Sequence, residues 1–363
     1  MAYFKFSDID LSGIASAIPS NKVKLSDYQL QYDKETFDSF LKKTGAVELH
    51  KAHELQTSSD LGYVAAGVLI DKKQLEKEQI GVIIFVSKTP DYRSPATACV
   101  LHGRLGLSKD CIAFDVNLGG SGFVHGIQIV SSLLDTTEKK YGLLIVGDTT
   151  SKQLAPLDPL NLVYSDGVSA VLIEKRKDAK PLYIRTLSEG SNYQSMIVPG
   201  GGFRTIPEEE TPDAYRDGSG RTSGNLFVHQ GKLSGFASDE IPAAVREFML
   251  KYNSQVSDYD FFAFNQTDVA VLKHISDTLG IPFDKVLVNP SGFGDTCGNS
   301  IPLLLTDGFG GSDQKEIHVL ACGFGEGLSW GVADFYMNTK NLIPVIETDA
   351  VFEDGAVSHV FQQ

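Results

Sequence analysis

A glycine-rich turn that joins a strand to a helix is the feature that most restricts how this chain can fold. The turn, Asn117-Leu-Gly-Gly-Ser-Gly122, follows a β-type run at 111–116 and precedes a helix at 121–134 that is apolar on nearly every side. A helix of that kind has to be buried. Backbone N–H groups at such a turn converge on whatever lies over the start of the helix. The pattern therefore predicts a central, buried helix with backbone donors gathered over its N-terminal end.

A looser copy of this unit returns in the second half of the chain. A predicted strand at 285–289 is followed by a glycine-rich loop at 291–298 and by a helix that opens near 299. Short β-branched runs predict further strands at 82–86, 143–146, 168–173, 261–264 and 317–321. We expect an α/β fold of two similar halves, residues 1–175 and 176–340, with a C-terminal extension at 341–363.

Composition narrows the range of functions. The 363 residues are 42% hydrophobic, carry a formal net charge of -14, and include four scattered cysteines that form no C-x-x-C pair. We expect no disulfide framework, no metal and no other cofactor. Dispersed basic residues argue against a nucleic-acid partner. The sequence has neither a membrane-length apolar run nor a signal-like start, so a cytoplasmic protein with no membrane partner is expected.

The order of several short motifs resembles the β-ketoacyl-acyl-carrier-protein synthase III family, which has the thiolase fold. The resemblance spans residues 8 to 338 and rests on Lys43-Thr-Gly45, Ser94-Pro-Ala-Thr-Ala98, Ala113-Phe-Asp-Val116, Ser121-Gly-Phe123, Tyr164-Ser-Asp-Gly167, Gly294, Thr296, Ser300-Ile-Pro302 and Gly323-Phe-Gly-Glu-Gly-Leu-Ser-Trp-Gly331. It implies a duplicated, five-layered α-β-α-β-α fold and a homodimer. It also implies an acyltransferase that condenses an acyl thioester with malonyl-acyl carrier protein in fatty acid or related acyl-chain biosynthesis.

The family's three catalytic side chains are all replaced in this chain. Gly120 stands at the position of the acyl-accepting cysteine, Asn265 at that of the histidine, and Asp295 at that of the asparagine. Glycine offers no nucleophile, asparagine cannot shuttle a proton near neutral pH, and aspartate brings a negative charge in place of a neutral donor. The usual condensation therefore cannot run through these side chains.

The backbone around this gap matches the family's oxyanion hole, which the resemblance places at the N–H groups of Gly120 and Gly327. Three interpretations follow. In the first, the chain is a non-catalytic acyl-binding protein or the partner of an active ketosynthase. In the second, it is an acyltransferase that uses Ser121 as nucleophile or Asp295 as base. In the third, the three residues were introduced into an ordinary synthase.

Each alternative nucleophile or base also has a structural interpretation. Ser121 fits a hydroxyl that caps the start of the helix. Cys297, two residues after Asp295, fits a small buried thiol. Glu326 lies inside the glycine-rich loop beside the expected oxyanion site, where it is either a base or a solvated carboxylate.

The resemblance also bears on substrate and partner. Ser39 and Gln153 stand where acetyl-coenzyme-A-dependent members carry a Trp and an Arg, so an acyl chain borne on acyl carrier protein is the expected donor. Its acidic surface would dock on local basic residues, for which the candidates are Lys42, Lys43, Arg204, Lys232 and Lys273. The loop at 89–95 matches the segment that crosses the family's dimer. We therefore expect an acyl pocket formed by Arg93, Ser94 and Phe123, roomier or more polar than one that selects acetyl.

Overall fold

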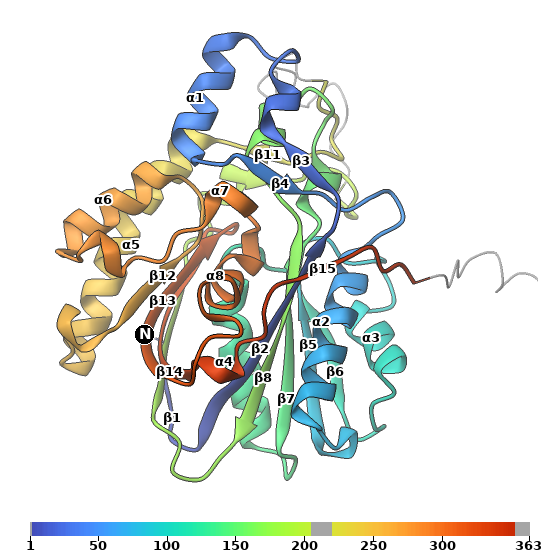
Figure 1. The fold of residues 1–363 in the computed structure, drawn as a ribbon, viewed down its shortest axis with the longest axis vertical. Helices are drawn as coiled ribbons and strands as arrows, with labels where there is room; N and C mark the ends of the chain where they lie inside the picture. Colours follow the sequence, from blue (N-terminus) through green and yellow to red (C-terminus); the bar gives the residue numbers. More distant parts are fainter. Residues whose placement is uncertain (1, 205–219, 353–363) are drawn as a thin grey trace, which may run out of the picture.

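Two mixed β-sheets, each covered by helices on both faces, make up the fold (Figure 1). The computed structural model describes residues 2–204 and 220–352. The first sheet has six strands, in the order β15 (Ile346–Thr348), β2 (Ile9–Pro19), β8 (Gly167–Lys175), β7 (Tyr141–Asp148), β5 (Ile80–Val86) and β6 (Ile112–Val116). The second has five strands, in the order β1 (Ala2–Phe6), β9 (Leu182–Ser188), β14 (Ser329–Asn338), β13 (Glu316–Gly325) and β12 (Phe261–Phe264).

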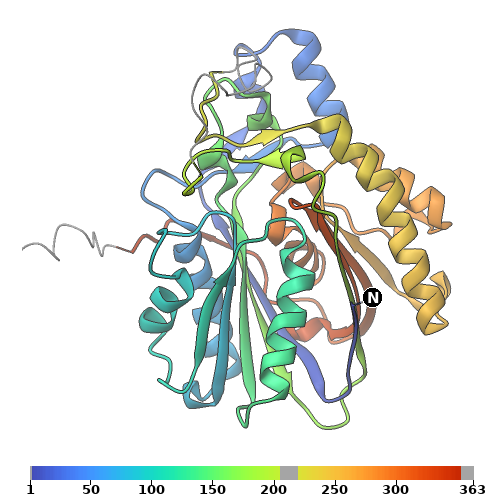
Figure 2. The ribbon, with the colours of Figure 1, turned by 180° about the vertical axis from the view of Figure 1, so that it is seen from behind.

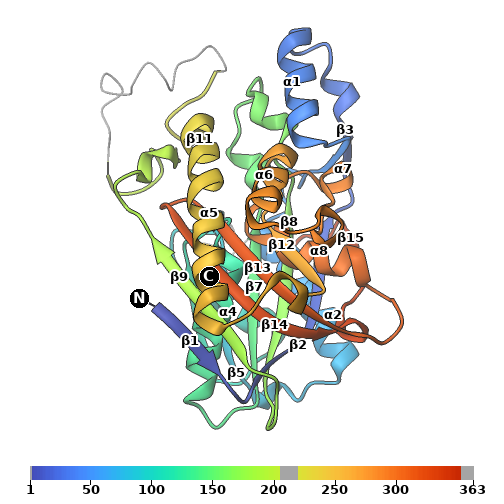
Figure 3. The ribbon, with the colours of Figure 1, turned by 90° about the vertical axis from the view of Figure 1, so that its left-hand side faces the viewer.

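Helices fill the three layers around these sheets. Between the sheets lie α4 (Gly122–Asp135) and α8 (Ser300–Phe309), and Figure 2 shows α4 from behind. The outer face of the six-stranded sheet is covered by α2 (Ser58–Lys73) and α3 (Thr97–Leu105). The outer face of the five-stranded sheet is covered by α5 (Gln230–Tyr252) and α6 (Val269–Leu279), seen in front in Figure 3. The expected α-β-α-β-α layering is thus confirmed.

A cap of short elements sits at one end of the sheets (Figure 1). It contains α1 (Lys34–Thr44), α7 (Pro290–Phe293) and two small antiparallel ribbons, formed by β3 (Lys22–Lys24) with β4 (Glu48–His50) and by β10 (Met196–Ile197) with β11 (Phe227–Val228). Strands near both ends of the chain join sheets that are built mainly from distant segments. Strand β1 joins the second sheet beside β9, and β15 in the C-terminal extension pairs in parallel with β2 of the first sheet.

Helix α4 is central, as its all-round apolar pattern predicts. Its side chains Phe123, Ile127, Val130 and Leu134 are fully buried. They belong to one core cluster with residues of β5 and β7 on one side and of β13 and β14 on the other. Each large apolar side chain buried in this way contributes about 1.5–3 kcal/mol. The start of α4 is therefore fixed between both sheets.

One predicted strand is wrong. Residues 285–289 form no strand; a 3₁₀ turn at Phe283–Lys285 leads into a stretch that makes only an isolated bridge between Val286 and Phe262. Pro290 ends this stretch by starting α7, so there is no length for a full ladder. The run of apolar residues had the composition of a strand but not the space for one.

Two family motifs hold the loops around the sheets. The Asp115 carboxylate accepts hydrogen bonds from the backbone N–H groups of Thr97 and Ala98, at 2.6 and 2.7 Å, and so fixes the start of α3. The buried Asp166 carboxylate accepts from the N–H groups of Ala52 and Ser151, at 2.8 and 2.9 Å. Both motifs therefore anchor loops.

None of the helices described here is long and apolar enough to cross a membrane.

Candidate active site

A cavity of about 340 Å³ connects α1 with the turn before α4. Its walls come from α1, α5, the start of α6, the 3₁₀ turn Pro159–Leu162, and the ends of β10, β11 and β13. Gly120, Asn265 and Asp295 all line it. The structure therefore brings together, beside the start of α4, the three positions that the resemblance singled out.

Asn265 and Asp295 are both tied to the backbone of the site. The Asn265 amide donates from Nδ2 to the Cys297 carbonyl oxygen at 3.1 Å, and its Oδ1 accepts from the Phe324 N–H at 3.3 Å. The Asp295 carboxylate accepts from the Cys297 N–H at 2.8 Å and from the Ser300 hydroxyl at 3.4 Å. These bonds hold the residues around Cys297 in a fixed arrangement.

Position 120 has no room for a side chain. A Cβ atom built on Gly120 would lie 2.2 Å from the carbonyl oxygen of Phe324 and 2.8 Å from Nδ2 of Asn265. The first contact is with backbone, which cannot rotate away as a flexible side chain can. Glycine is therefore required by the packing of β13 against this turn.

The oxyanion donor expected at Gly120 already has an acceptor within the chain. Oε2 of Glu326 accepts a hydrogen bond from the Gly120 N–H at 3.2 Å. Oε1 of the same carboxylate is 2.9 Å from Nζ of Lys88. Both side chains are largely buried, with 10% of Lys88 and 20% of Glu326 exposed. Glu326 is thus a buried ion-pair partner, and the solvated loop carboxylate considered from the sequence is not what the structure has.

A cysteine thiol completes this cluster. Sγ of Cys297 lies 3.2 Å from Nζ of Lys88 and 3.5 Å from the Thr150 hydroxyl. Cys297 is 4% exposed and lines the cavity. Nζ of Lys88 also lies over the Tyr164 ring, 5.5 Å from its centroid. One ammonium group therefore contacts a thiol, a carboxylate and an aromatic face.

Burial and charge set the protonation of these groups. Burial would lower the pKa of Lys88, but the negative charges around it hold that pKa well above its ordinary value. Burial would raise the pKa of Glu326, yet attraction by Lys88 outweighs it and the net pKa is lowered. Burial raises the pKa of the Cys297 thiol well above its ordinary value, against the effect of Lys88. Near neutral pH the cluster is an ammonium–carboxylate pair beside a protonated thiol.

Asp295 differs from the other carboxylate. Burial raises its pKa from 3.8 to about 6. The carboxyl group is therefore mostly ionised at neutral pH, but its pKa is close enough to 7 for the carboxylate to accept a proton. This is the range in which a carboxylate works as a general base.

Ser121 and Gly327 lie beside the site. The Ser121 hydroxyl is 1% exposed and hydrogen-bonded to the Ser329 hydroxyl at 2.6 Å, and it makes no capping bond to the helix. Gly327 follows Glu326 in the loop between β13 and β14. Within the described part of the chain, neither residue lines the cavity.

The residues expected to form the acyl pocket are elsewhere. Arg93 and Ser94 are exposed on the loop that follows β5. Phe123 is fully buried in the core, where its ring meets that of Phe335 edge to face at 6.3 Å. None of the three lines this cavity among the described residues.

The sequence did not point to Lys88, and it marked Tyr164 only as part of a motif and not as the aromatic ring beneath the Lys88 ammonium. Lys88 comes two residues after β5, at the carboxyl end of a strand that is parallel to both its neighbours. Ligand sites of open α/β sheets gather at that end, so position alone offered a signal. No cluster of metal-ligating side chains is found within residues 2–204 and 220–352.

Known proteins that are similar to this chain show which family it belongs to. The family model described as 3-oxoacyl-[acyl-carrier-protein] synthase III matches residues 114–190, and the model of its C-terminal part matches residues 249–336. A β-ketoacyl-[acyl-carrier-protein] synthase III of Clostridioides difficile is 30% identical over 331 residues, covering 88% of this chain and 96% of its own. The corresponding protein of Clostridium perfringens is 28% identical, covering 88% and 97%. A 3-oxoacyl-(acyl-carrier protein) synthase structure from Burkholderia xenovorans superposes with a TM-score of 0.87 at 29% identity, covering 96% of this chain and 99% of its own.

The two layered sheets around a buried helix pair define a protein of the thiolase-like fold class. The chain belongs to the 3-oxoacyl-[acyl-carrier-protein] synthase III family. The resemblance found from the sequence motifs is thereby confirmed.

Proposed function

We propose that this chain is an acyltransferase of the synthase III type that accepts an acyl group from a thioester bound in the 340 Å³ cavity. The observation that carries this is the convergence of Gly120, Asn265, Asp295 and Cys297 on one cavity. A backbone donor, a carboxylate with a pKa near 6 and a thiol are the components that acyl transfer requires. Position 120 is occupied by glycine, so the reaction does not pass through a side chain there.

The donor in this proposal is an acyl chain on acyl carrier protein. Four of the basic candidates lie on helices that contribute residues to the cavity wall: Lys42 and Lys43 on α1, Lys232 on α5 and Lys273 on α6. Lys43 lines the cavity itself. Arg204 is exposed in the loop after β10. An acidic carrier would be steered to this rim despite the overall charge of -14, because local potential governs encounter.

The proposed assembly is a homodimer formed across β6. This strand is the edge of the six-stranded sheet, and Ile112 at its start is 39% exposed. No strand among the described residues pairs with its outer side, and an edge of this kind readily extends into a second copy. The exposed loop with Arg93 and Ser94 follows β5, the neighbour of β6, and in the dimer it would reach the partner's acyl pocket.

The test is to give the purified chain acyl carrier proteins loaded with chains of several lengths and to measure release of free carrier thiol. We expect thiol release together with an acyl mass on the protein. Saturable binding without release would overturn the acyltransferase proposal in favour of a non-catalytic acyl-binding protein. A Lys42→Glu/Lys43→Glu variant is expected to slow association and weaken its salt dependence, whereas Lys72→Glu on α2 serves as the matched control.

A further inference from the structure

We infer that Cys297 is the acyl acceptor of this site, with Lys88 as the residue that positions and stabilises its sulfur and Glu326 as an internal occupant that the thioester displaces. The inference rests on the proposed acyl transfer. It moves the nucleophile from the start of α4 to the loop that leads into α8.

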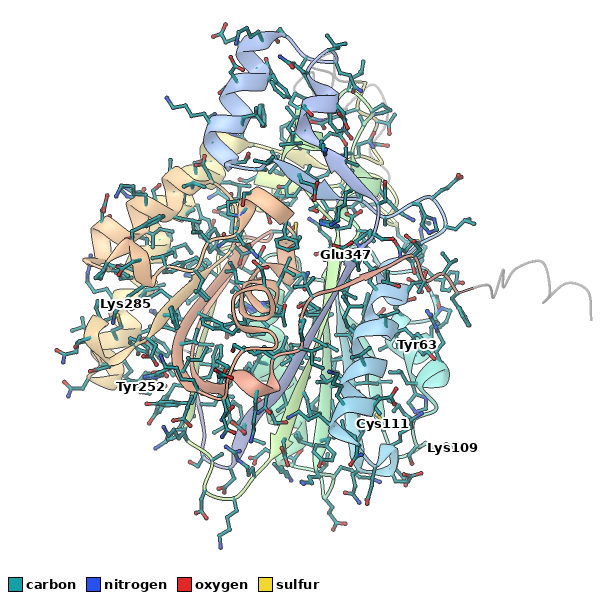
Figure 4. All side chains as sticks on the ribbon, viewed as in Figure 1. Tyr63, Lys109, Cys111, Tyr252, Lys285 and Glu347 are labelled. Atoms are coloured by element: carbon teal, nitrogen blue, oxygen red, sulfur yellow. The ribbon has the colours of Figure 1, made fainter. Side chains whose placement is uncertain are left out.

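Of the four cysteines, all of which lie in the described part of the chain, Cys297 alone lines the cavity. Cys99 is exposed and Cys322 is buried in the core of the second sheet. Cys111 lies beside β6, and Figure 4 shows it on the opposite flank of the molecule from Tyr252 and Lys285. Only one thiol can therefore meet a substrate that also reaches Gly120.

The position of Cys297 joins it to the remains of the triad. Its carbonyl oxygen accepts from Asn265, and its N–H donates to Asp295. Its backbone has a φ of +52°, in the left-handed region that side chains rarely adopt. These two hydrogen bonds maintain that conformation.

Lys88 supplies the charge that a thiolate needs. Its ammonium is 3.2 Å from Sγ of Cys297, and both groups are buried. A nearby ammonium lowers the pKa of a cysteine, the more strongly where water is excluded. The backbone N–H of Lys88 is itself fixed by the Asp148 carboxylate at 2.8 Å. Lys88 is therefore held in place beside the thiol.

Glu326 opposes this effect while it stays in the site. Its carboxylate neutralises Lys88 and occupies the Gly120 N–H. Glu326 is among the charges that raise the pKa of Cys297, whereas Lys88 lowers it. A thioester whose carbonyl oxygen takes the Gly120 N–H must displace the carboxylate. Lys88 then faces Cys297 without its counter-ion, so substrate binding itself favours the thiolate.

The transfer step balances as a thioester exchange. Sγ of Cys297 attacks the carbonyl carbon, and the developing oxyanion is held by the Gly120 N–H. The bond between that carbon and the carrier sulfur breaks as the bond to Sγ forms. The proton of the Cys297 thiol ends on the released carrier sulfur, with Asp295 as the nearby base that can relay it. No redox change and no further reactant is involved.

The experiment combines thiol release with mass spectrometry of digested protein after exposure to acyl carrier protein loaded with an acyl chain. In the natural chain we expect acyl mass on the peptide that contains Cys297. Cys297→Ala should abolish that adduct and slow thiol release by about 1,000-fold or more, while still binding a non-transferable acyl thioether analogue. Cys99→Ser is the matched control and should behave as the natural chain.

Lys88 is tested by the pH at which Cys297 reacts with iodoacetamide, read on the same peptide. Lys88→Met should move this pH upward and Glu326→Gln should move it downward, a change that a purely structural role would not produce. Undiminished thiol release in Cys297→Ala, or acyl mass on another residue, would overturn the inference but leave acyl transfer standing. Absence of both release and adduct in the natural chain would instead overturn the proposed function.

Discussion

The carboxylate of Glu326 accepts a hydrogen bond from the backbone N–H of Gly120 at 3.2 Å, the donor that we propose for the oxygen of a thioester. Removing its negative charge should ease entry of the substrate carbonyl. We expect Glu326→Gln to bind an acyl thioether analogue about fivefold or more tightly, because the charged hydrogen bond to be broken is worth at least about 1 kcal/mol more than a neutral one. Calorimetric titration measures this. Glu138→Gln, at an exposed carboxylate after α4, should leave affinity unchanged, and weaker binding by Glu326→Gln would contradict the account.

Gly120 is required by packing, so its replacement should be costly in the folded state. Gly120→Ala is expected to lower the free energy of unfolding by about 1–3 kcal/mol, because its Cβ would meet the Phe324 carbonyl oxygen at 2.2 Å. Gly67→Ala is the control: Gly67 is helical, with no described heavy atom within 4 Å of its Cβ position. That change should stabilise by about 0.5–1 kcal/mol. Urea unfolding compares the two, and equal effects would show that position 120 has space after all.

The same contact bears on restoring the family's triad. Replacing Gly120 by cysteine, Asn265 by histidine and Asp295 by asparagine supplies the missing side chains, but the first of these does not fit the present backbone. We therefore expect the triple variant to show no synthase III condensation in an assay with malonyl-acyl carrier protein. Condensation by the triple variant would show that β13 moves away from residue 120 readily.

Much of the fold could be predicted from the sequence, because the buried faces of helices and strands carry apolar residues at regular intervals. The all-round apolar pattern of residues 121–134 predicted α4 and its central place, and β-branched runs predicted β5, β7, β8, β12 and β13. The strand predicted at 285–289 is wrong because composition does not show whether a neighbouring strand is there to pair with the segment. The pairing of β1 with β9 and of β15 with β2 could not be predicted either, since it joins residues far apart in the sequence.

The site was predicted only where motifs repeat a known pattern. Gly120, Asn265 and Asp295 were singled out by their positions in those motifs, and all three line one cavity. The ion pair of Lys88 and Glu326 joins residues 238 positions apart, and no local pattern marks such a pair. Phe123 was expected in a pocket wall because the apolar residues around it in the sequence fit a pocket wall and a core equally well. Its side chain lies in the core.

Lys88 should contribute to stability as well as to reactivity. Lys88→Met leaves the Glu326 carboxylate buried without its cation, and we expect a loss of about 3–5 kcal/mol in the free energy of unfolding. The exposed pair of Lys273 and Asp277, 3.4 Å apart on α6, provides the comparison. Lys273→Met should cost less than about 1 kcal/mol. A similar small loss for Lys88→Met would mean that the buried pair is not held as the structure has it.

Asp295 gives the stability a pH dependence of known sign. Its pKa is about 6 in the folded chain against an ordinary 3.8, so the folded state binds the proton more tightly than the unfolded state. Its contribution to stability is present below about pH 4, falls by up to about 1.4 kcal/mol per unit as the pH rises towards 6, and is constant above that. In denaturant titrations at several pH values, Asp295→Asn should remove this fall. Asp277→Asn, at an exposed carboxylate, should retain it.

The β6 edge provides a test of the proposed assembly. Ile112→Lys should place a charge on each copy of the edge and shift the protein towards monomer in light scattering, because a two-fold axis brings the same surface together twice. Leu250→Lys alters a side chain that is 74% exposed on α5, away from β6, and should not change the mass. A natural chain that is monomeric at all concentrations would contradict the dimer.

The central claim is that acyl transfer takes place in this cavity without a side chain at residue 120. The most direct measurement is the rate at which the natural chain releases free thiol from a long-chain acyl-acyl carrier protein, compared with Cys297→Ala at equal substrate occupancy. The account predicts release by the natural chain with an acyl group on Cys297, and near-complete loss of both in the variant. Release from neither protein would contradict the claim, whereas release at the same rate from both would contradict only the role of Cys297.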